Sequence, residues 1–313
     1  MTMTVVLATQ ENIRKASQIL SSGGVVAFPT ETVYGLGCDT TNKEAVSRVY
    51  TLKNRPNDNP LIAHVSTVEE AKKITIGWDD RCDQLAERFW PGPLTIILNR
   101  RESVPKEACG GTDTIAVRCP NHEIAKKLIK EFGGPISAPS ANISGHTSPT
   151  TATHVHNDFG DELFVLDGGP CDKGIESTVI SMVGNPIVLR RGSIEVGELL
   201  HVISGVVAQT PASQNESPGS SDKHYAPNAR MVLQSSKEIS KQYGEDIVFL
   251  VIKTKPASGT VITLPTTSGE YAKLLYAAIR EADAMKPKAI HVEKPPNTPG
   301  WEAINDRLRR ASS

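Results

Sequence analysis

The stretch that decides the fold is VVAFPTETVYGLGCDT (residues 25–40). Its first five residues, VVAFP (25–29), are apolar and rich in β-branched side chains, which predicts a short buried strand. From Phe28 to Thr40 the chain then leaves this strand as a loop with hydroxyl groups, a phenol and two glycines. Glycines let the backbone approach a ligand closely, so the loop favours small-molecule recognition. A polar turn that caps the next helix is the simpler explanation of this loop taken alone.

Further apolar runs predict more strands, at LIAHV (61–65), LTIIL (94–98), TIAVR (114–118), LFVLD (163–167) and STVISM (177–182). Helical spacing of apolar residues predicts helices over 11–21, 42–52, 79–89, 121–131 and 195–201. Strands and helices do not alternate strictly, and long loops rich in Gly and Pro separate the strands. The pattern predicts an α/β domain with a twisted mixed sheet rather than a plain doubly wound one.

The composition changes near residue 207. Residues 207–228 lose hydrophobic periodicity and are dominated by Ser, Pro, Gly and Asn, which is typical of a linker. Beyond them, strands are expected at 230–234, 246–252, 260–264 and 288–292, and helices at 236–243, 269–285 and 299–310. A chain of 313 residues is long for one core. We therefore expect a first domain over 1–206, a linker over 207–228 and a small Rossmann-like α/β domain over 229–313.

The overall composition is that of an ordinary globular protein, with 38% hydrophobic residues and a formal net charge of −1. This balance argues against a disordered chain and against nucleic-acid binding through bulk charge, but a local basic pocket remains compatible with it. No apolar run approaches the roughly 20 residues of a membrane span, and the N-terminus lacks a signal-peptide pattern. The five cysteines are scattered and form no CxxC pair, so we expect a cytoplasmic protein without a metal site.

The segment KNRPNDNPL (53–61) places two cations beside two prolines. The prolines restrict the loop, so Lys53 and Arg55 start partly preorganised. Two neighbouring cations repel each other, and an anionic ligand relieves this repulsion through charge-assisted hydrogen bonds. A solvated helix end explains Lys53 equally well. His64, on the next strand, is either part of a site or an ordinary half-buried histidine.

Other polar segments point to the same kind of ligand. Alternation along TIAVR places Thr114 and Arg118 on one face of a strand. The loop PISAPSANISGHTSP (135–149) offers many hydroxyl and backbone groups with little bulk, which suits phosphate and ribose oxygens. No phosphate-binding GxxxxGK[ST] loop, GxSxG elbow or HExxH motif occurs, and no nucleophile is paired with a base. The residues predict binding of an anionic ligand rich in hydroxyls, with catalysis by positioning and charge stabilisation.

Seven ordered motifs, FPTETVYGLG, KNRPxxNPL, WPGPLT, AVR, PSAN, GxEST and LRxG, resemble those of the YrdC-type threonylcarbamoyl-AMP synthase family across residues 24–194. The segment SPGSSDKHYAP (217–227) and the unit after it resemble the long, two-domain form. The resemblance implies a twisted sheet around a concave basic cavity. It also implies that L-threonine, bicarbonate and ATP give threonylcarbamoyl-AMP and pyrophosphate, for the threonylcarbamoyl group of a tRNA adenosine.

The resemblance also implies roles for single residues. Threonine would be held by Thr32, His64, Arg118, Ala138 through its backbone, and Ser177, with Arg118 facing the carboxylate. ATP would be held by Lys53, Arg55, Asn59, Thr114, Ser140, Asn142, Ser148, Arg191 and Tyr225, with Lys53 and Arg55 catalytic and Tyr225 closing over the nucleotide. Mg²⁺ would travel with the triphosphate. The linker departs from the family pattern, because it lacks a bulkier, more basic run before HYAP.

Two other functions fit parts of the sequence. YrdC-like domains also occur in maturation factors that handle carbamoyl phosphate, but the expected acylphosphatase-like and zinc-finger segments are not found here. A double-stranded RNA-binding module could use the same basic concavity, and the net charge argues against it. We expect small-molecule partners, transfer of the product to a tRNA threonylcarbamoyl-transferase complex, no stable nucleic-acid binding and no membrane association.

Overall fold

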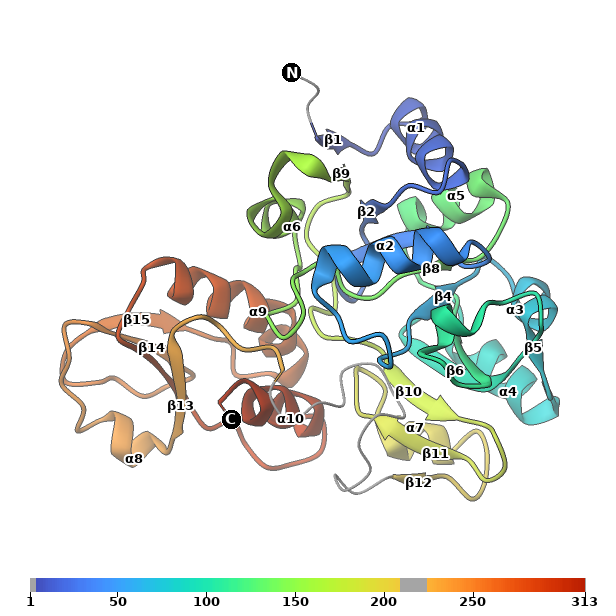
Figure 1. Cartoon of the computed structure of the whole chain (residues 1–313). Coiled ribbons are helices and arrows are strands. Elements are labelled where there is room, and N and C mark those ends of the chain that lie inside the picture. The colour runs from blue at the N-terminus through green and yellow to red at the C-terminus, as the bar shows by residue number, and fades with distance from the viewer. Residues whose placement is uncertain (1–3, 209–223, 313) are drawn as a thin grey trace.

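A computed structural model describes residues 4–208 and 224–312, which form two sheets and their covering helices (Figure 1). The larger sheet, with its helices, lies on one side of the molecule, and the smaller sheet lies on the other (Figure 1). Within the described residues, no helix is both long and apolar enough to cross a membrane.

In the described part of the chain the larger sheet has twelve strands in the order β1-β9-β2-β3-β8-β4-β7-β6-β10-β11-β12, with β5 paired to β6. The strands are β1 (Val5–Leu7), β2 (Val26–Phe28), β3 (Gly35–Asp39), β4 (Ile62–His64), β5 (Thr75–Ile76), β6 (Leu94–Arg100), β7 (Thr114–Arg118), β8 (Ile136–Ser137), β9 (Phe164–Asp167), β10 (Thr178–Ser181), β11 (Ile187–Arg190) and β12 (Val207–Ala208). The sheet is mixed: β4–β7 is one of its parallel pairs, and β6–β7 is one of its antiparallel pairs. The twisted mixed α/β sheet expected from the sequence is confirmed.

The helices of this part pack on both sides of the sheet. They are α1 (Gln10–Ser21), α2 (Lys43–Lys53), α3 (Val68–Ile74), α4 (Asp80–Phe89), α5 (Glu123–Phe132), α6 (Ala152–Phe159) and α7 (Val196–Leu200).

The start of α2 is capped by the Asn42 side chain, which accepts a hydrogen bond from the Ala45 amide. The helix ends at Asn54, whose backbone is left-handed with φ 51°. This turn directs the chain into the loop that carries Arg55.

One expectation about the opening stretch was wrong. Residues 28–40 were expected to form a loop, yet β3 lies within them and pairs antiparallel with β2 through Val26 and Gly37. A Cβ atom at Gly37 would lie 2.7 Å from the Phe28 ring and 2.8 Å from Ile136, so only glycine fits under these side chains. The glycines that suggested a loop therefore allow close packing of a strand.

In the C-terminal part, the described residues form a four-stranded sheet in which every strand pair is parallel, in the order β13-β16-β14-β15. Its elements are β13 (Arg230–Gln234), α8 (Ser236–Ile239), β14 (Ile247–Val251), β15 (Thr260–Thr263), α9 (Ser268–Ala284), β16 (Ala289–Glu293) and α10 (Glu302–Ala311). Val33 and Ile175 of the first part share an apolar cluster with residues of α9 and α10. The expected domain boundaries at 206 and 229 stay a prediction, because residues 209–223, including most of the unusual linker segment, lie outside the described residues.

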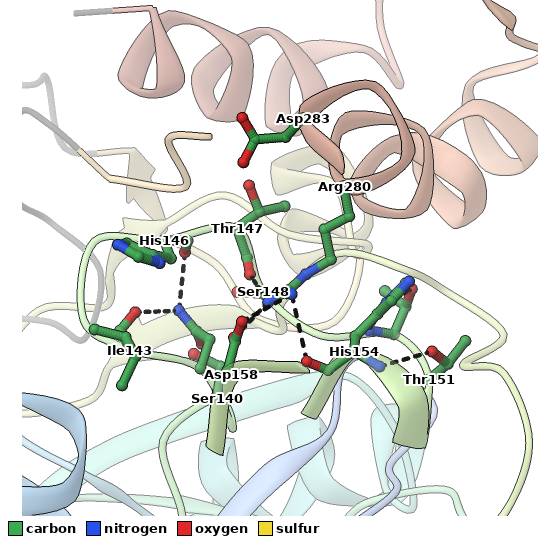
Figure 2. A network of polar contacts seen from close by, with 12 residues as sticks. Ser140, Ile143, His146, Thr147, Ser148, Thr151, His154, Asp158, Arg280 and Asp283 are labelled. Carbon is green, nitrogen blue, oxygen red and sulfur yellow. Dashed lines mark hydrogen bonds and ion pairs between the residues drawn. The ribbon is translucent and has the colours of Figure 1, made fainter. Parts of the chain in front are cut away.

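Polar contacts also join α9 to the first part of the molecule (Figure 2). The Arg280 guanidinium contacts both carboxylate oxygens of Asp158, at 3.0 and 2.7 Å, and donates to the Thr147 carbonyl at 2.5 Å. One turn further on, Asp283 accepts hydrogen bonds from the backbone amides of Asn228 and Ala229, at 3.0 and 2.8 Å. Helix α9 therefore fixes the chain immediately after Tyr225 against the loop before α6.

Candidate active site

A cavity opens where the ends of β4 and β7 meet the loops after β2, after β8 and before β10. All five residues expected to hold threonine line this cavity, namely Thr32, His64, Arg118, Ala138 and Ser177. Of the residues expected to hold ATP, three line it, namely Arg55, Ser140 and Tyr225. The cavity wall also contains residues that the sequence did not single out for a site, among them Val33, Ile62, Glu176, Arg190 and His224.

Arg118 ends β7 and lies almost fully buried at the cavity. Its guanidinium donates to the Thr32 hydroxyl at 2.9 Å and to the Gly92 carbonyl at 3.2 Å. The remaining nitrogen of the guanidinium, Nη2, lies 2.7 Å from Oε1 of Glu31. The two atoms are close but not aligned as a hydrogen bond, so this contact is an ion pair. Burial acts to raise the pKa of Glu31, but the charge of Arg118 outweighs it and holds that pKa below its ordinary value. The guanidinium is thereby fixed in position.

His64 and Ala138 offer hydrogen-bond acceptors beside this guanidinium. The Nδ1 atom of His64 lies 3.0 Å from the Ile62 carbonyl, which can only accept, so we assign the proton to Nδ1 and leave Nε2 as an acceptor. Burial, aided by the charge of Arg118, lowers the pKa of His64 to about 3, so the ring is neutral. The Ala138 amide donates to the Ile62 carbonyl at 2.9 Å, and its own carbonyl has no bonded donor among the described residues.

The depressed pKa of His64 predicts how stability depends on pH. Its pKa is about 3 in the folded chain against 6.5 for a free side chain, so only the unfolded chain gains a proton between these values. The free energy of unfolding therefore falls as pH drops from 6.5 toward 3, by at most about 1.4 kcal/mol per pH unit for this group. We expect His64→Asn to reduce that slope in urea unfolding at pH 7, 6 and 5. The same change at exposed His201 is the control, and equal slopes for wild type and His64→Asn would contradict the account.

Arg55 is held by the loop that follows it. Its Nε and Nη2 atoms donate to the carbonyl and side-chain oxygens of Asn59, at 3.0 and 2.5 Å, and Nη2 donates to the Pro60 carbonyl at 3.1 Å. Nη1 has no hydrogen-bond partner within the described residues. Burial lowers the pKa of Arg55 to about 10, which still leaves it charged at neutral pH. Asn59 therefore anchors Arg55, and it does not line the cavity.

Lys53 lies behind the cavity wall rather than in it. Its ammonium donates to the carbonyl of Ser140 at 2.6 Å and to that of Asn142. Burial, and next the charge of Arg55, hold the pKa of Lys53 well below its ordinary value. The side chain fixes the 140–142 loop whose Ser140 lines the cavity.

The two neighbouring arginines before Gly192 have different places. Arg190 is buried at the cavity and donates to the Ser177 carbonyl at 3.1 Å and to the Ser177 hydroxyl at 3.0 Å. Arg191 is exposed and lies beside Lys173 at a separate hollow. Successive side chains at a strand end alternate between faces, and LRRG alone does not tell which arginine points inward. The structure thus places Arg190, and not the expected Arg191, in the cavity.

Three more expected ATP residues lie outside the cavity wall. Thr114 begins β7, four residues before Arg118 and so about 13 Å from it along the strand. The side-chain amide of Asn142 donates to the carbonyls of Ile143 and His146, both at 2.8 Å. The Ser148 hydroxyl donates to Glu176 at 2.7 Å. Asn142 and Ser148 therefore stabilise the segments that form the cavity wall.

Tyr225 closes one side of the cavity. Its side chain is buried, and its backbone has a positive φ of 62°, which is uncommon for a residue with a side chain. The ring stacks on Tyr276 of α9, with 5.7 Å between ring centres, and lies 5.3 Å from the Arg307 guanidinium of α10. The preceding residue, His224, is also buried at the cavity.

Comparisons with known proteins identify relatives of this chain. A family model described as "Telomere recombination" matches residues 18–192, and one described as "Threonylcarbamoyl-AMP synthase, C-terminal domain" matches 194–313. The Threonylcarbamoyl-AMP synthase of Pyrococcus abyssi is 38% identical over 99% of this chain and 98% of its own. That of Bacillus subtilis is 37% identical over 96% of this chain and 92% of its own. The crystal structure of P. abyssi Sua5 complexed with L-threonine superposes with a TM-score of 0.92 at 37% identity, and covers 100% of this chain and 98% of that one.

Proposed function

The chain belongs to the threonylcarbamoyl-AMP synthase family, and from this premise we propose which residues carry its reaction. The enzyme joins L-threonine, bicarbonate and ATP to form L-threonylcarbamoyladenylate and pyrophosphate. The observation that supports our assignment is that the five threonine-side residues come from five separate segments and line one cavity with Arg55 and Arg190. An amino acid and a polyphosphate both find complementary charge there.

Threonine fits the end of the cavity around Arg118. Its carboxylate would take charge-assisted hydrogen bonds from the guanidinium, which Glu31 and Thr32 hold in place. The Nε2 atom of neutral His64 and the carbonyl of Ala138 are acceptors for the amine and the side-chain hydroxyl. Since His64 stays neutral, it does not repel a protonated amine before that amine loses its proton.

The reaction then depends on the positioning of the substrates and needs no covalent intermediate with the enzyme. The amine nitrogen forms a bond to the carbon of CO₂, which derives from bicarbonate, and releases a proton to give a carbamate. A carbamate oxygen attacks the α-phosphorus of ATP, the bond from this phosphorus to the bridging oxygen breaks, and pyrophosphate leaves. Arg55 and Arg190 are placed to stabilise the negative charge that builds up on the phosphate oxygens. Binding within the cavity reduces the contact of the labile carbamate with water.

In this proposal four residues hold the loops around the part of the cavity that binds ATP, namely Lys53, Asn59, Asn142 and Ser148. Thr114 contacts only the far end of the nucleotide.

Mg²⁺ enters as part of the MgATP substrate. The acid at the cavity wall, Glu176, is bonded to Arg307, Tyr276 and Ser148. The described residues bring together no group of three side chains that could hold a metal ion. The triphosphate itself therefore supplies the oxygen ligands.

Pyrophosphate release tests this function. We expect the purified enzyme to release pyrophosphate from MgATP only when both L-threonine and bicarbonate are present. Buffers freed of CO₂ and reactions without threonine are the controls. Equal release without threonine would rule the proposed reaction out.

The adenylate is a reactive mixed anhydride, so we also propose its direct transfer, in the cytoplasm, to a tRNA threonylcarbamoyl-transferase complex.

A further inference from the structure

One face of helix α9 lies against the segments that hold Tyr225 at the cavity. Tyr276, Arg280 and Asp283 follow one another at intervals of four and three residues, so a helix places them on one face. The Tyr276 ring stacks on the ring of Tyr225, with 5.7 Å between their centres. Figure 2 shows Arg280 extending from α9 to Asp158 and to the loop that contains Thr147.

Arg280 connects α9 to the backbone of Tyr225 through one intermediate residue. Its guanidinium contacts both carboxylate oxygens of Asp158 and donates to the Thr147 carbonyl (Figure 2). The side chains of Arg280 and Asp158 are only 14% and 12% exposed, so solvent screens this ion pair little. Thr147 is buried as well, and its hydroxyl donates to the Tyr225 carbonyl at 3.1 Å. The ion pair therefore fixes the residue to which the Tyr225 carbonyl is bonded.

The chain directly after Tyr225 is held at two further points. The Ala226 amide donates to the Gly145 carbonyl at 2.9 Å. Asp283 accepts hydrogen bonds from the Asn228 and Ala229 amides, at 3.0 and 2.8 Å, and from the Asn228 side chain at 2.9 Å. These bonds fix the direction in which the chain leaves Tyr225.

Tyr225 depends on such contacts because its backbone conformation is uncommon. Its φ of 62° lies in the left-handed region, which is unfavourable for a residue with a side chain. A residue keeps such a conformation where its surroundings hold it in place. Here the Thr147 hydroxyl, the bonded Ala226 amide and the Tyr276 ring provide these surroundings.

We propose that Arg280 and Asp283 are positioning residues for the nucleotide, because they hold Tyr225 in the conformation in which it lines the cavity. Without them the backbone of Tyr225 is free to return to a negative φ, and this rotation turns its ring away from the cavity wall. The inference rests on the proposed function in one respect, that ATP is the ligand beside Tyr225.

The effect is expected on the ATP side of the cavity. Arg118, at the threonine side, is held by Glu31, Thr32 and Gly92, which all belong to the first part of the chain. Arg280 and Asp283 belong to α9 in the C-terminal part. The C-terminal part thus contributes to the binding of one substrate and leaves the binding of the other unchanged.

The first test measures the affinities for a non-hydrolysable ATP analogue and for L-threonine by calorimetry. Arg280→Met keeps the length of the side chain but loses its bonds to Asp158 and Thr147. We expect the Kd for the analogue to rise ~10-fold and the Kd for threonine to stay within twofold of wild type. Arg280→Lys, which keeps the charge without the planar fork, should lie between the two.

Lys273→Gln is the matched control on the same helix. It breaks the exposed contact between α9 and Asp172, 3.4 Å long, and should change neither affinity. A purely structural role of Arg280 predicts a different result, in which Arg280→Met lowers the melting temperature and weakens both ligands alike. That result would contradict the proposal.

A double-mutant cycle tests whether Arg280 acts through Tyr225. Tyr225→Ala removes the ring that Arg280 is proposed to position. Adding Arg280→Met to Tyr225→Ala should therefore weaken binding of the analogue by less than about twofold. A further ~10-fold loss in this background would show that the two residues act independently, and the proposal would be wrong.

Two milder variants keep the test decisive if Arg280→Met does not fold. Thr147→Val removes the hydroxyl that donates to Tyr225 and keeps the shape of the side chain. Asp283→Ala removes the acceptor of the Asn228 and Ala229 amides. We expect each to raise the Kd for the analogue about threefold. Unchanged affinity in both variants would overturn the proposal.

Hydrogen exchange in the free enzyme separates this inference from the proposed function. The Ala226 amide should exchange ~10-fold faster in Arg280→Met than in wild type, while the Val65 amide, bonded to the Arg118 carbonyl, keeps its rate. If the wild type released no pyrophosphate with threonine and bicarbonate, the proposed reaction would be wrong, but faster exchange together with weaker analogue binding would still support the positioning role. An unchanged rate at Ala226, or a faster rate with unchanged analogue affinity, would contradict that role whatever the wild type catalyses.

Discussion

Replacing Arg118 by methionine is expected to lower kcat/KM for L-threonine by ~10²–10³-fold, mainly through KM, because it removes the cation that we propose to face the substrate carboxylate. Arg118 is only 4% exposed, and its three contacts to Glu31, Thr32 and Gly92 hold it at the cavity. A charge-assisted hydrogen bond at such a site is stronger than one in water. The affinity for an ATP analogue should change much less. Steady-state kinetics with threonine varied, combined with calorimetry for the analogue, gives both values.

Arg118→Met also leaves Glu31 buried without its partner, which threatens the fold. The double variant Arg118→Met/Glu31→Gln removes this second effect, and we expect it to be more stable than the single variant but equally poor with threonine. Arg118→Lys, which keeps the charge but loses the planar fork, should lie between wild type and methionine. If the double variant regained wild-type kinetics with threonine, Arg118 would not be the group that binds the carboxylate.

The second large effect is expected on the ATP side. Arg55→Ala should weaken binding of MgATP by ~30–100-fold while threonine affinity stays within a few-fold of wild type, since it removes the hydrogen bonds that we propose between this buried cation and a phosphate. Asn59 and Pro60 hold the guanidinium through Nε and Nη2, and we propose that Nη1 contacts the nucleotide. Calorimetric titration of each ligand separately measures the two affinities.

Arg191→Ala is the matched control for this experiment. Arg191 is an arginine of the same domain, but it is exposed and outside the cavity, so its loss should leave ATP affinity unchanged. Arg190→Ala, in contrast, should resemble Arg55→Ala. Loss of threonine affinity in Arg55→Ala, with ATP affinity unchanged, would show that our division of the cavity between the two substrates is wrong.

The fold was largely predictable because its signals are local. The apolar runs at 61–65 and 114–118 became β4 and β7, and helical spacing predicted α1 and α5 to within two residues. Strand β3 was missed because its glycines are required by packing under Phe28, a contact that no local pattern contains.

The position of a site residue could be predicted from the sequence where the local pattern alone determines it. Arg118 is the last residue of a buried strand, so its placement at a cavity followed from the pattern. The choice between Arg190 and Arg191 depends on which face of a strand end turns inward. The ion pair of Glu176 and Arg307 joins two parts of the chain that the sequence treats separately. The choice between the two arginines and the presence of this ion pair could be established only from the tertiary structure.

The central claim is that this enzyme links threonine to AMP through a carbon atom that comes from bicarbonate. Mass spectrometry of the adenylate formed from MgATP, L-threonine and ¹³C-bicarbonate tests it most directly. The account predicts a threonylcarbamoyladenylate that carries the ¹³C label, formed together with pyrophosphate. An unlabelled threonyl adenylate, in which the threonine carboxylate itself is joined to AMP, would contradict it.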